Sequence, residues 1–174
     1  MKNKILIIFL LATILILVLL SSKLLDTNNY NDVLAIQNNI NDYAFFADSR
    51  KSIEQANLFT EDATIEVYSN NEGKYSLSQT RIGKIDIKKG FETLKNFEET
   101  THLNGQSNIA VYENKATNVS YCIAHHVFTE NGKKVLLTMS IKYEDKLVKD
   151  DKDWLFSKRK LYIQWTDKKI MNQD

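Results

Sequence analysis

The stretch that decides the fold is HLNGQSNIAVYENKATNVSYCIAHHVFTENGKKVLLTMSIKYE, residues 102–144, followed closely by WLFSKRKLYIQW, residues 154–165. In both segments apolar and polar side chains alternate with a period of two, which is typical of half-buried strands. Turns rich in Asn, Gly and charged residues, and a charged loop over 145–153, separate four expected strands at residues 102–112, 116–129, 134–144 and 154–165. Strands joined in this way pair as an antiparallel meander.

The segment before the meander has the spacing of helices instead. Apolar residues recur every three or four positions, which predicts helices at residues 32–46, 52–58 and 86–99. Between the second and third helices, two short strands are expected at 64–68 and 82–85, with a polar loop or hairpin over 70–78. Helices followed by an antiparallel sheet indicate an α+β domain.

The first 23 residues are predicted to lie outside this domain. Lys2 and Lys4 precede an apolar run over 5–20 that only Thr13 interrupts. Such a segment is typical of a membrane anchor or of a cleaved signal peptide, and the lysines favour a cytoplasmic N-terminus. We therefore expect a domain on the extracytoplasmic side, membrane-anchored or secreted. The expected organisation is an anchor or signal segment over 1–23, a tether over 24–31, the domain over 32–168 and a tail over 169–174.

The charge and cysteine content exclude several classes of function. The whole chain carries 23 basic and 22 acidic residues. Without Lys2, Lys4 and Lys23 the balance is 20 against 22, or −2, which is not the concentrated basic surface of a nucleic-acid-binding protein. Cys122 is the single cysteine, so neither an intrachain disulfide nor a cysteine-rich zinc site can form.

Short motifs follow one another in a characteristic order along residues 33–165. They are Tyr43-Ala44 with Asp48, residues 58–63, residues 81–84 with Ile87, Gly90-Phe91, Thr101-His102, Ala116-Thr117, Ala124-His125-His126, residues 143–145, and residues 154–156 with Arg159. This order resembles the SnoaL-like family of the nuclear-transport-factor-2-like superfamily, in the branch of scytalone dehydratase and bile-acid 7α-dehydratase. The resemblance implies a cone-shaped curved antiparallel sheet wrapped around N-terminal helices. It also implies a pocket open at one end, in folds that host dehydratases, isomerases, cyclases and binding modules.

The resemblance assigns acid–base roles to an aspartate and a histidine. Asp48 occupies the position of the family's acid, and His102 that of its catalytic histidine, while Tyr43 matches a pocket tyrosine of the bile-acid enzyme. An imidazole titrates near neutrality, and a carboxylate at one ring nitrogen fixes its tautomer and stabilises the imidazolium. Each residue also has a simpler interpretation: Asp48 could cap the next helix, His102 could lie on the surface, and Tyr43 could belong to the core.

The adjacent His125 and His126 cannot share one small site, because neighbours on a strand point to opposite faces. His126 shares its face with Cys122 and Ala124, whose small side chains leave room for a ligand. We therefore place His126 in the pocket with Cys122 in its wall, and keep His125 as the alternative. No two histidines have the spacing of helical metal ligands, so no metal site is predicted.

Two aromatic residues, Phe46 and Tyr68, complete the expected pocket lining. The chain also departs from scytalone dehydratase, because Ala47 and Val67 stand where that enzyme has tyrosines. A dehydratase acting on the same substrate is therefore not expected.

Two functions remain open from the sequence. The first is a cofactor-independent lyase or isomerase that acts on a small hydrophobic molecule through the Asp48–His102 pair. The second is a non-catalytic module of the same fold, which binds a small ligand or a protein outside the cytoplasmic membrane. No cofactor is expected for either function, and the sheet offers a surface through which the chain could form a homo-oligomer.

Overall fold

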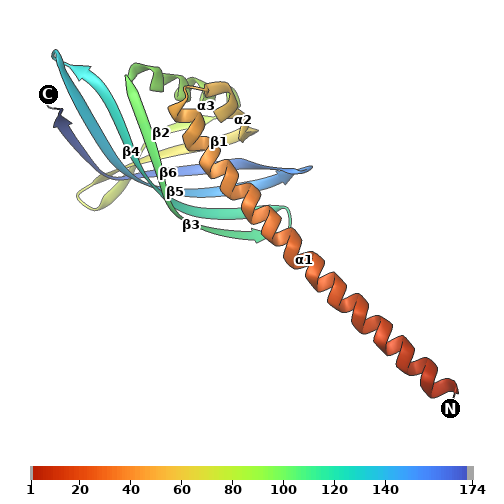
Figure 1. The fold of residues 1–174 in the computed structure, drawn as a ribbon. Helices are drawn as coiled ribbons and strands as arrows, with labels where there is room; N and C mark the ends of the chain where they lie inside the picture. Colours follow the sequence, from red (N-terminus) through yellow and green to blue (C-terminus); the bar gives the residue numbers. More distant parts are fainter. Residues whose placement is uncertain (1, 172–174) are drawn as a thin grey trace.

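A six-stranded sheet in the order β2-β1-β6-β5-β4-β3 curves around the helices in the computed structural model (Figure 1). The structure describes the backbone of residues 2–171, and the side chains of that range except those of residues 2–10, 12, 19 and 21–28. Helices precede a curved sheet that closes around them, so the expected α+β cone is confirmed.

The predicted meander forms the larger part of the sheet. Its strands are β3 (Glu99–Tyr112), β4 (Lys115–Glu130), β5 (Lys133–Asp150) and β6 (Asp153–Ile170), and each pairs antiparallel with the next. The turns between them place Glu113, Asn131 and Asp151 at φ of 51°, 52° and 52°. Residues at positive φ give tight hairpins the twist that their strands require.

The charged stretch 145–153, predicted as a loop, is strand as far as Asp150. Asp145 and Leu147 point inward and are 3% and 1% exposed, while Lys146 between them is exposed. The period of two therefore continues through the charged stretch. The prediction was wrong because Asp145 is neutralised inside the sheet by Arg159, 2.8 Å away.

The sheet begins with a hairpin of β1 (Phe59–Asn71) and β2 (Lys74–Ile82). β1 pairs with β6, the last strand, and this pairing is parallel. The sheet is therefore antiparallel except at the join between β1 and β6. The join brings the beginning and the end of the domain together and leaves β2 and β3 as the edges.

The helices differ in length from their predictions. α1 (Lys2–Asp48) includes residues 24–31, the predicted tether, and begins thirty residues before the expected start at 32. Neither proline nor glycine occurs before Gly73, so nothing in the sequence breaks this helix. α2 (Ser52–Asn57) matches its prediction closely, whereas α3 (Lys84–Glu92) is shorter and continues as a 3-10 helix, Thr93–Asn96.

The first part of α1 extends away from the sheet (Figure 1). In the part of the chain that the structure describes, no helix carries an apolar stretch long enough to cross a membrane. Most side chains of the predicted anchor or signal segment, residues 1–23, lie outside the described ones, as do residues 172–174 of the predicted tail. The anchor, the extracytoplasmic location and the homo-oligomer stay predictions.

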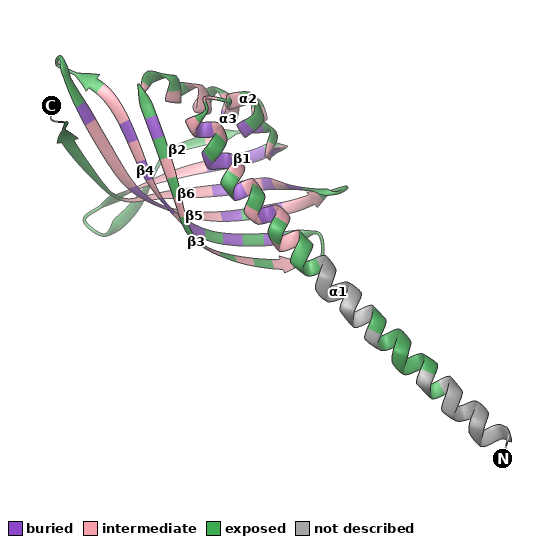
Figure 2. Ribbon diagram, in the orientation of Figure 1, coloured by how far each residue is buried: buried purple, intermediate pink, exposed green. Residues whose placement is uncertain are grey.

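The core lies between the second half of α1 and the concave face of the sheet. Ile36 and Ile40 of α1 pack with Phe59 of β1, Ile141 of β5 and Phe156 of β6, all at most 2% exposed. Buried and exposed positions alternate along the strands (Figure 2). Each fully buried side chain of this size contributes about 1.5–3 kcal/mol, so α1 is held firmly against the sheet and its last residue, Asp48, is fixed in position.

Candidate active site

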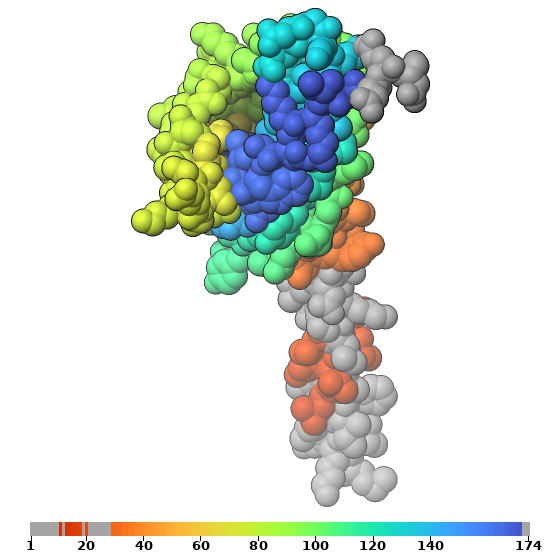
Figure 3. All heavy atoms as spheres, turned by 90° about the vertical axis from the view of Figure 1, so that its left-hand side faces the viewer, coloured from red at the N-terminus to blue at the C-terminus, as the bar shows by residue number. Residues whose placement is uncertain are grey.

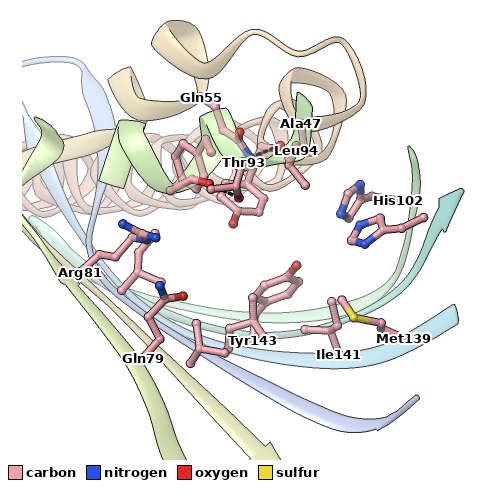
Figure 4. Close-up of a pocket in the computed structure, with 17 residues that line it drawn as sticks. Ala47, Gln55, Gln79, Arg81, Thr93, Leu94, His102, Met139, Ile141 and Tyr143 are labelled. Carbon is pink, nitrogen blue, oxygen red and sulfur yellow. Dashed lines mark hydrogen bonds between the residues drawn. The ribbon is translucent and has the colours of Figure 1, made fainter. Parts of the chain in front are cut away.

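A cavity of about 180 Å³ occupies the open end of the cone. Figure 3 shows the hollow between the C-terminal strand, in blue, and the segment around β2 and α3, in yellow to green. Side chains from α1, α3 and the concave face of the sheet line it (Figure 4). About half of them are apolar, and the polar ones include His102, His126, Tyr43 and Tyr143.

Asp48 and His102 are in direct contact at the wall of this cavity. The Asp48 Oδ1 atom lies 2.6 Å from His102 Nδ1, and the same oxygen accepts a hydrogen bond from the Thr100 hydroxyl at 2.9 Å. The Asp48 Oδ2 atom accepts a hydrogen bond from the His102 backbone N–H at 2.8 Å. The carboxylate is thus fixed by the start of β3, and it fixes the imidazole in turn. His102 Nε2 is the ring nitrogen left for a molecule in the cavity.

Arg50 holds the end of α1 against β3. Its Nη1 donates to the Thr100 hydroxyl at 2.6 Å and to the carbonyl oxygens of Ala47 and Asp48, and its Nη2 donates to the Phe97 carbonyl. Because the Thr100 hydroxyl accepts from Arg50, its proton is directed at Asp48. A cation at a helix C-terminus also interacts favourably with the helix dipole. Arg50 and Thr100 were not predicted as site residues, although their polar side chains stand two positions after Asp48 and two before His102.

His126 is the buried neighbour of His102. The centroids of the His102 and His126 rings are 5.4 Å apart, and the centroid of the Phe97 ring lies 4.4 Å from that of His126. His126 is 6% exposed, and its Nε2 has no hydrogen-bond partner among the described residues. Burial, with the charges of His102 and Arg50, lowers the pKa of His126 to about 4. His126 is therefore a neutral imidazole at pH 7 with one ring nitrogen free for a ligand.

This pKa predicts a pH-dependent stability. Between about pH 6.5 and 4 the unfolded chain binds a proton at His126 that the folded chain excludes, so the free energy of unfolding should fall by about 2–3 kcal/mol as the pH is lowered. Denaturant unfolding at several pH values measures the effect. His126→Gln should remove this part of the pH dependence, whereas His125→Gln on the opposite face should retain it. An unchanged pH dependence in His126→Gln would disprove the assignment.

Tyr43 and Tyr143 supply the phenolic groups of the cavity. The Arg159 guanidinium lies over both rings, 4.0 Å and 4.4 Å from their centroids. Burial raises the pKa of both tyrosines, so their hydroxyls stay protonated and can donate hydrogen bonds. Tyr143 rises from β5 toward the middle of the cavity (Figure 4). It was missed as a site residue, although it alternates on β5 with Ile141 and Met139, which also line the cavity.

The predicted site residues separate into two groups. Asp48, His102, His126 and Tyr43 lie together in or beside the cavity, whereas four predicted ligand contacts are not among its lining residues. These four are Phe46, Cys122, His125 and Tyr68.

The four residues lie elsewhere for simple geometric reasons. Phe46 of α1 is not a lining residue, and its ring packs against that of Phe45, with 5.8 Å between the ring centroids. Cys122 belongs to the core, where burial raises the pKa of its thiol to about 11. Neither residue therefore lines the cavity.

His125 and Tyr68 do not line the cavity because successive residues of a strand point to opposite faces. His126 faces the cavity, so His125 faces the opposite side of β4. Val67 lines the cavity, so Tyr68 lies on the outer face, where it stacks on Tyr162 at 4.8 Å. In the described part of the chain, no three His, Cys, Asp or Glu side chains are grouped as metal ligands would be.

Solved structures with the same architecture include several enzymes of elimination chemistry by name. A provisionally assigned scytalone dehydratase from Novosphingobium aromaticivorans is 30% identical, with a TM-score of 0.64 over 80% of this chain and 88% of its own. The hexachlorocyclohexane dehydrochlorinase LinA-type3 from Novosphingobium barchaimii is 17% identical, with a TM-score of 0.68 over 86% of this chain and 96% of its own. The second likeness shows the fold alone.

Among curated proteins, none matches the chain in sequence. A family model, however, covers residues 28–160, most of the chain and nearly all of the segment whose motifs suggested the resemblance. Its description is SnoaL-like domain. The chain belongs to the SnoaL-like domain family.

Proposed function

We propose that the protein is a cofactor-independent lyase that eliminates water from a small, largely hydrophobic molecule. The observation that carries the proposal is the 2.6 Å contact between Asp48 Oδ1 and His102 Nδ1 at the wall of an apolar cavity. A carboxylate in this position keeps the proton on Nδ1, so that Nε2 is free to act as a base. The 30% identical neighbour is named as a dehydratase, which agrees with this chemistry.

The proposed reaction begins with proton transfer from carbon. His102 Nε2 takes the proton from the carbon next to a carbonyl group, and Asp48 stabilises the imidazolium that results. The electron pair of the broken C–H bond moves onto the carbonyl oxygen. Tyr143 is placed to donate a hydrogen bond to that oxygen, because its buried hydroxyl stays protonated.

The second half of the reaction returns the proton. The imidazolium of His102 protonates the β-hydroxyl group, the C–O bond breaks, and the electron pair of the enolate forms the double bond. Water leaves, and the enzyme is restored without a net gain or loss of protons. His126, neutral and with an unpartnered Nε2 in the described structure, can hold the departing hydroxyl by a hydrogen bond without competing for its proton.

One observation favours the alternative of a non-catalytic binding module. Ala47 and Val67 both line the cavity, so two phenolic hydroxyls of the scytalone enzyme have apolar replacements. A cavity with fewer polar groups fixes a substrate less strictly. This departure concerns substrate orientation rather than the Asp48–His102 pair, so we keep the lyase as the first proposal.

Proton exchange in deuterium oxide tests the lyase proposal. The full chain, incubated with a panel of small aromatic and alicyclic β-hydroxy ketones, should exchange the proton next to the carbonyl and release water, as followed by proton NMR. His102→Gln should slow both processes by at least about 100-fold, because the base is lost. His125→Gln, a histidine on the opposite face, should behave as the wild type. Tight binding of a ketone without exchange would favour the binding module and overturn the lyase.

A further inference from the structure

The cavity has a polar end that the proposed elimination does not use. Gln79 and Arg81 of β2 lie at one end of the cavity, and His102 lies at the other (Figure 4). Gln79 is exposed and Arg81 is half-buried, so this end is the one nearer to solvent. Apolar side chains, among them Leu161, Val67 and Phe91, also line the cavity.

The Arg81 guanidinium is held in place by α3. Its Nη1 donates to Asp86 twice, at 3.2 Å to the carboxylate and at 3.3 Å to the backbone carbonyl. Gly90 makes room for it, because a Cβ atom at that position would lie 2.3 Å from Arg81 Nε. A flexible side chain is thus seated against a helix at the edge of the cavity, which reduces the entropy lost when it binds a ligand.

The charge of Arg81 is only partly compensated. Its partner Asp86 is not among the lining residues, and the Asp86 side chain is 45% exposed, so solvent screens the pair. No acidic residue appears among the described residues that line the cavity, while Arg81 contributes a permanent positive charge. Both hydrogen bonds from Arg81 to Asp86 leave from Nη1, and a guanidinium has further N–H donors in a planar fork that suits a carboxylate.

We propose that the cavity takes an amphipathic carboxylate: a small hydrophobic molecule whose carboxylate binds Arg81 and Gln79, while its other end reaches His102. This inference rests on the proposed lyase for what happens at His102, but it concerns binding and is testable without turnover. The competing role for Arg81 is structural, as a tie between the β1–β2 hairpin and α3.

Paired probes distinguish the two roles. Cinnamate and cinnamamide, and indole-3-acetate and indole-3-acetamide, have the same shape within each pair and differ in charge. The wild-type full chain should bind each carboxylate about 10- to 100-fold more tightly than its amide, the value of one charge-assisted bidentate contact, as measured by ligand-observed NMR titration. Arg81→Gln should abolish this preference and leave the affinity for the amide nearly unchanged.

Two further variants keep the test interpretable. Gly90→Ala retains the charge and improves helix propensity, but its Cβ should displace the guanidinium and reduce the preference. Lys84→Gln removes a neighbouring cation that pairs with Glu61 outside the cavity, and the preference should survive it.

Equal affinity for both members of each pair, binding of neither member, or a preference that survives Arg81→Gln would overturn the proposal. The lyase would fail separately, through unchanged proton exchange in His102→Gln, so the two failures are distinguishable.

Discussion

Replacing Asp48 with asparagine should lower turnover of a true substrate by about 100- to 10,000-fold, while the fold stays intact. The loss should appear in kcat rather than KM, because Asp48 contacts His102 and is not among the residues that line the cavity. Stopped assays of the elimination, with circular dichroism as the check on folding, measure both quantities.

The physical reason lies in the hydrogen bonds of the carboxylate. Oδ2 accepts the His102 backbone N–H, and Oδ1 faces His102 Nδ1. In the asparagine variant an NH₂ group replaces one of these two oxygens. If it replaces Oδ2, the bond from the His102 backbone N–H is lost; if it replaces Oδ1, the bond from the Thr100 hydroxyl is lost, Nδ1 must become an acceptor, and the ring proton moves to Nε2, which removes the base from the cavity. The negative charge that stabilises the imidazolium is lost as well.

A matched control is present on the same helix. Asp32 of α1 bonds to Lys149 and to the Trp154 indole, away from the cavity, and Asp32→Asn should leave turnover unchanged. The losses in Asp48→Asn and His102→Gln should not add in the double variant, because the two residues act as one unit. Full turnover by a folded Asp48→Asn protein would refute acid–base coupling through this pair.

The meander and the helices could be predicted because a local rule determines each of them. The period of two along residues 102–144 needs no knowledge of the rest of the chain, and the structure has strands there. The parallel pairing of β1 with β6 could not be predicted in this way, since it joins segments about ninety residues apart. The same limit explains the start of α1, because no local signal marks where a helix without Gly or Pro leaves a domain.

The site residues, too, divide into those that the local sequence predicted and those that depend on contacts between distant segments. The resemblance named Asp48 and His102, and the alternation of β4 favoured His126 over His125, in agreement with the cavity lining. Arg50 and Thr100 were missed because they meet only when α1 crosses β3, fifty positions apart in the sequence. Cys122 was predicted to line the pocket because it shares the His126 face of β4, but it belongs to the core; neither Cys122 nor Phe46 is among the lining residues.

The stretch 145–153, predicted as a loop, contributes Asp145 to a buried ion pair with Arg159. Asp145 accepts two hydrogen bonds from Arg159, at 2.8 Å and 2.9 Å, and one from Asn118 at 2.9 Å. The side chains of Asp145 and Arg159 are 0% and 1% exposed. Burial alone would lower the pKa of Arg159, but the charge and hydrogen bonds of Asp145 outweigh it and raise that pKa. The arginine therefore stays charged inside the core.

Asp145→Asn should lower the free energy of unfolding by about 3–5 kcal/mol, because it leaves the Arg159 charge buried without a counterion. The Nη1 atom of Arg159 has no hydrogen-bond partner among the described residues, and the asparagine keeps one acceptor oxygen but no negative charge. Urea unfolding measures the change. Glu130→Gln breaks the Lys168–Glu130 pair, whose side chains are about half exposed, and should cost at most about 1 kcal/mol.

The double variant Asp145→Leu with Arg159→Met separates buried charge from packing. Replacing a buried ion pair by apolar residues of similar volume is often neutral or stabilising, so this variant should recover most of the stability lost in Asp145→Asn. It should nevertheless impair turnover, because the Arg159 guanidinium lies against Tyr43 and Tyr143, which line the cavity. If Asp145→Asn lowers the free energy of unfolding by no more than Glu130→Gln does, the Asp145 charge is not needed to stabilise the buried Arg159. If the double variant is both stable and fully active, Arg159 has no part in positioning the two tyrosines.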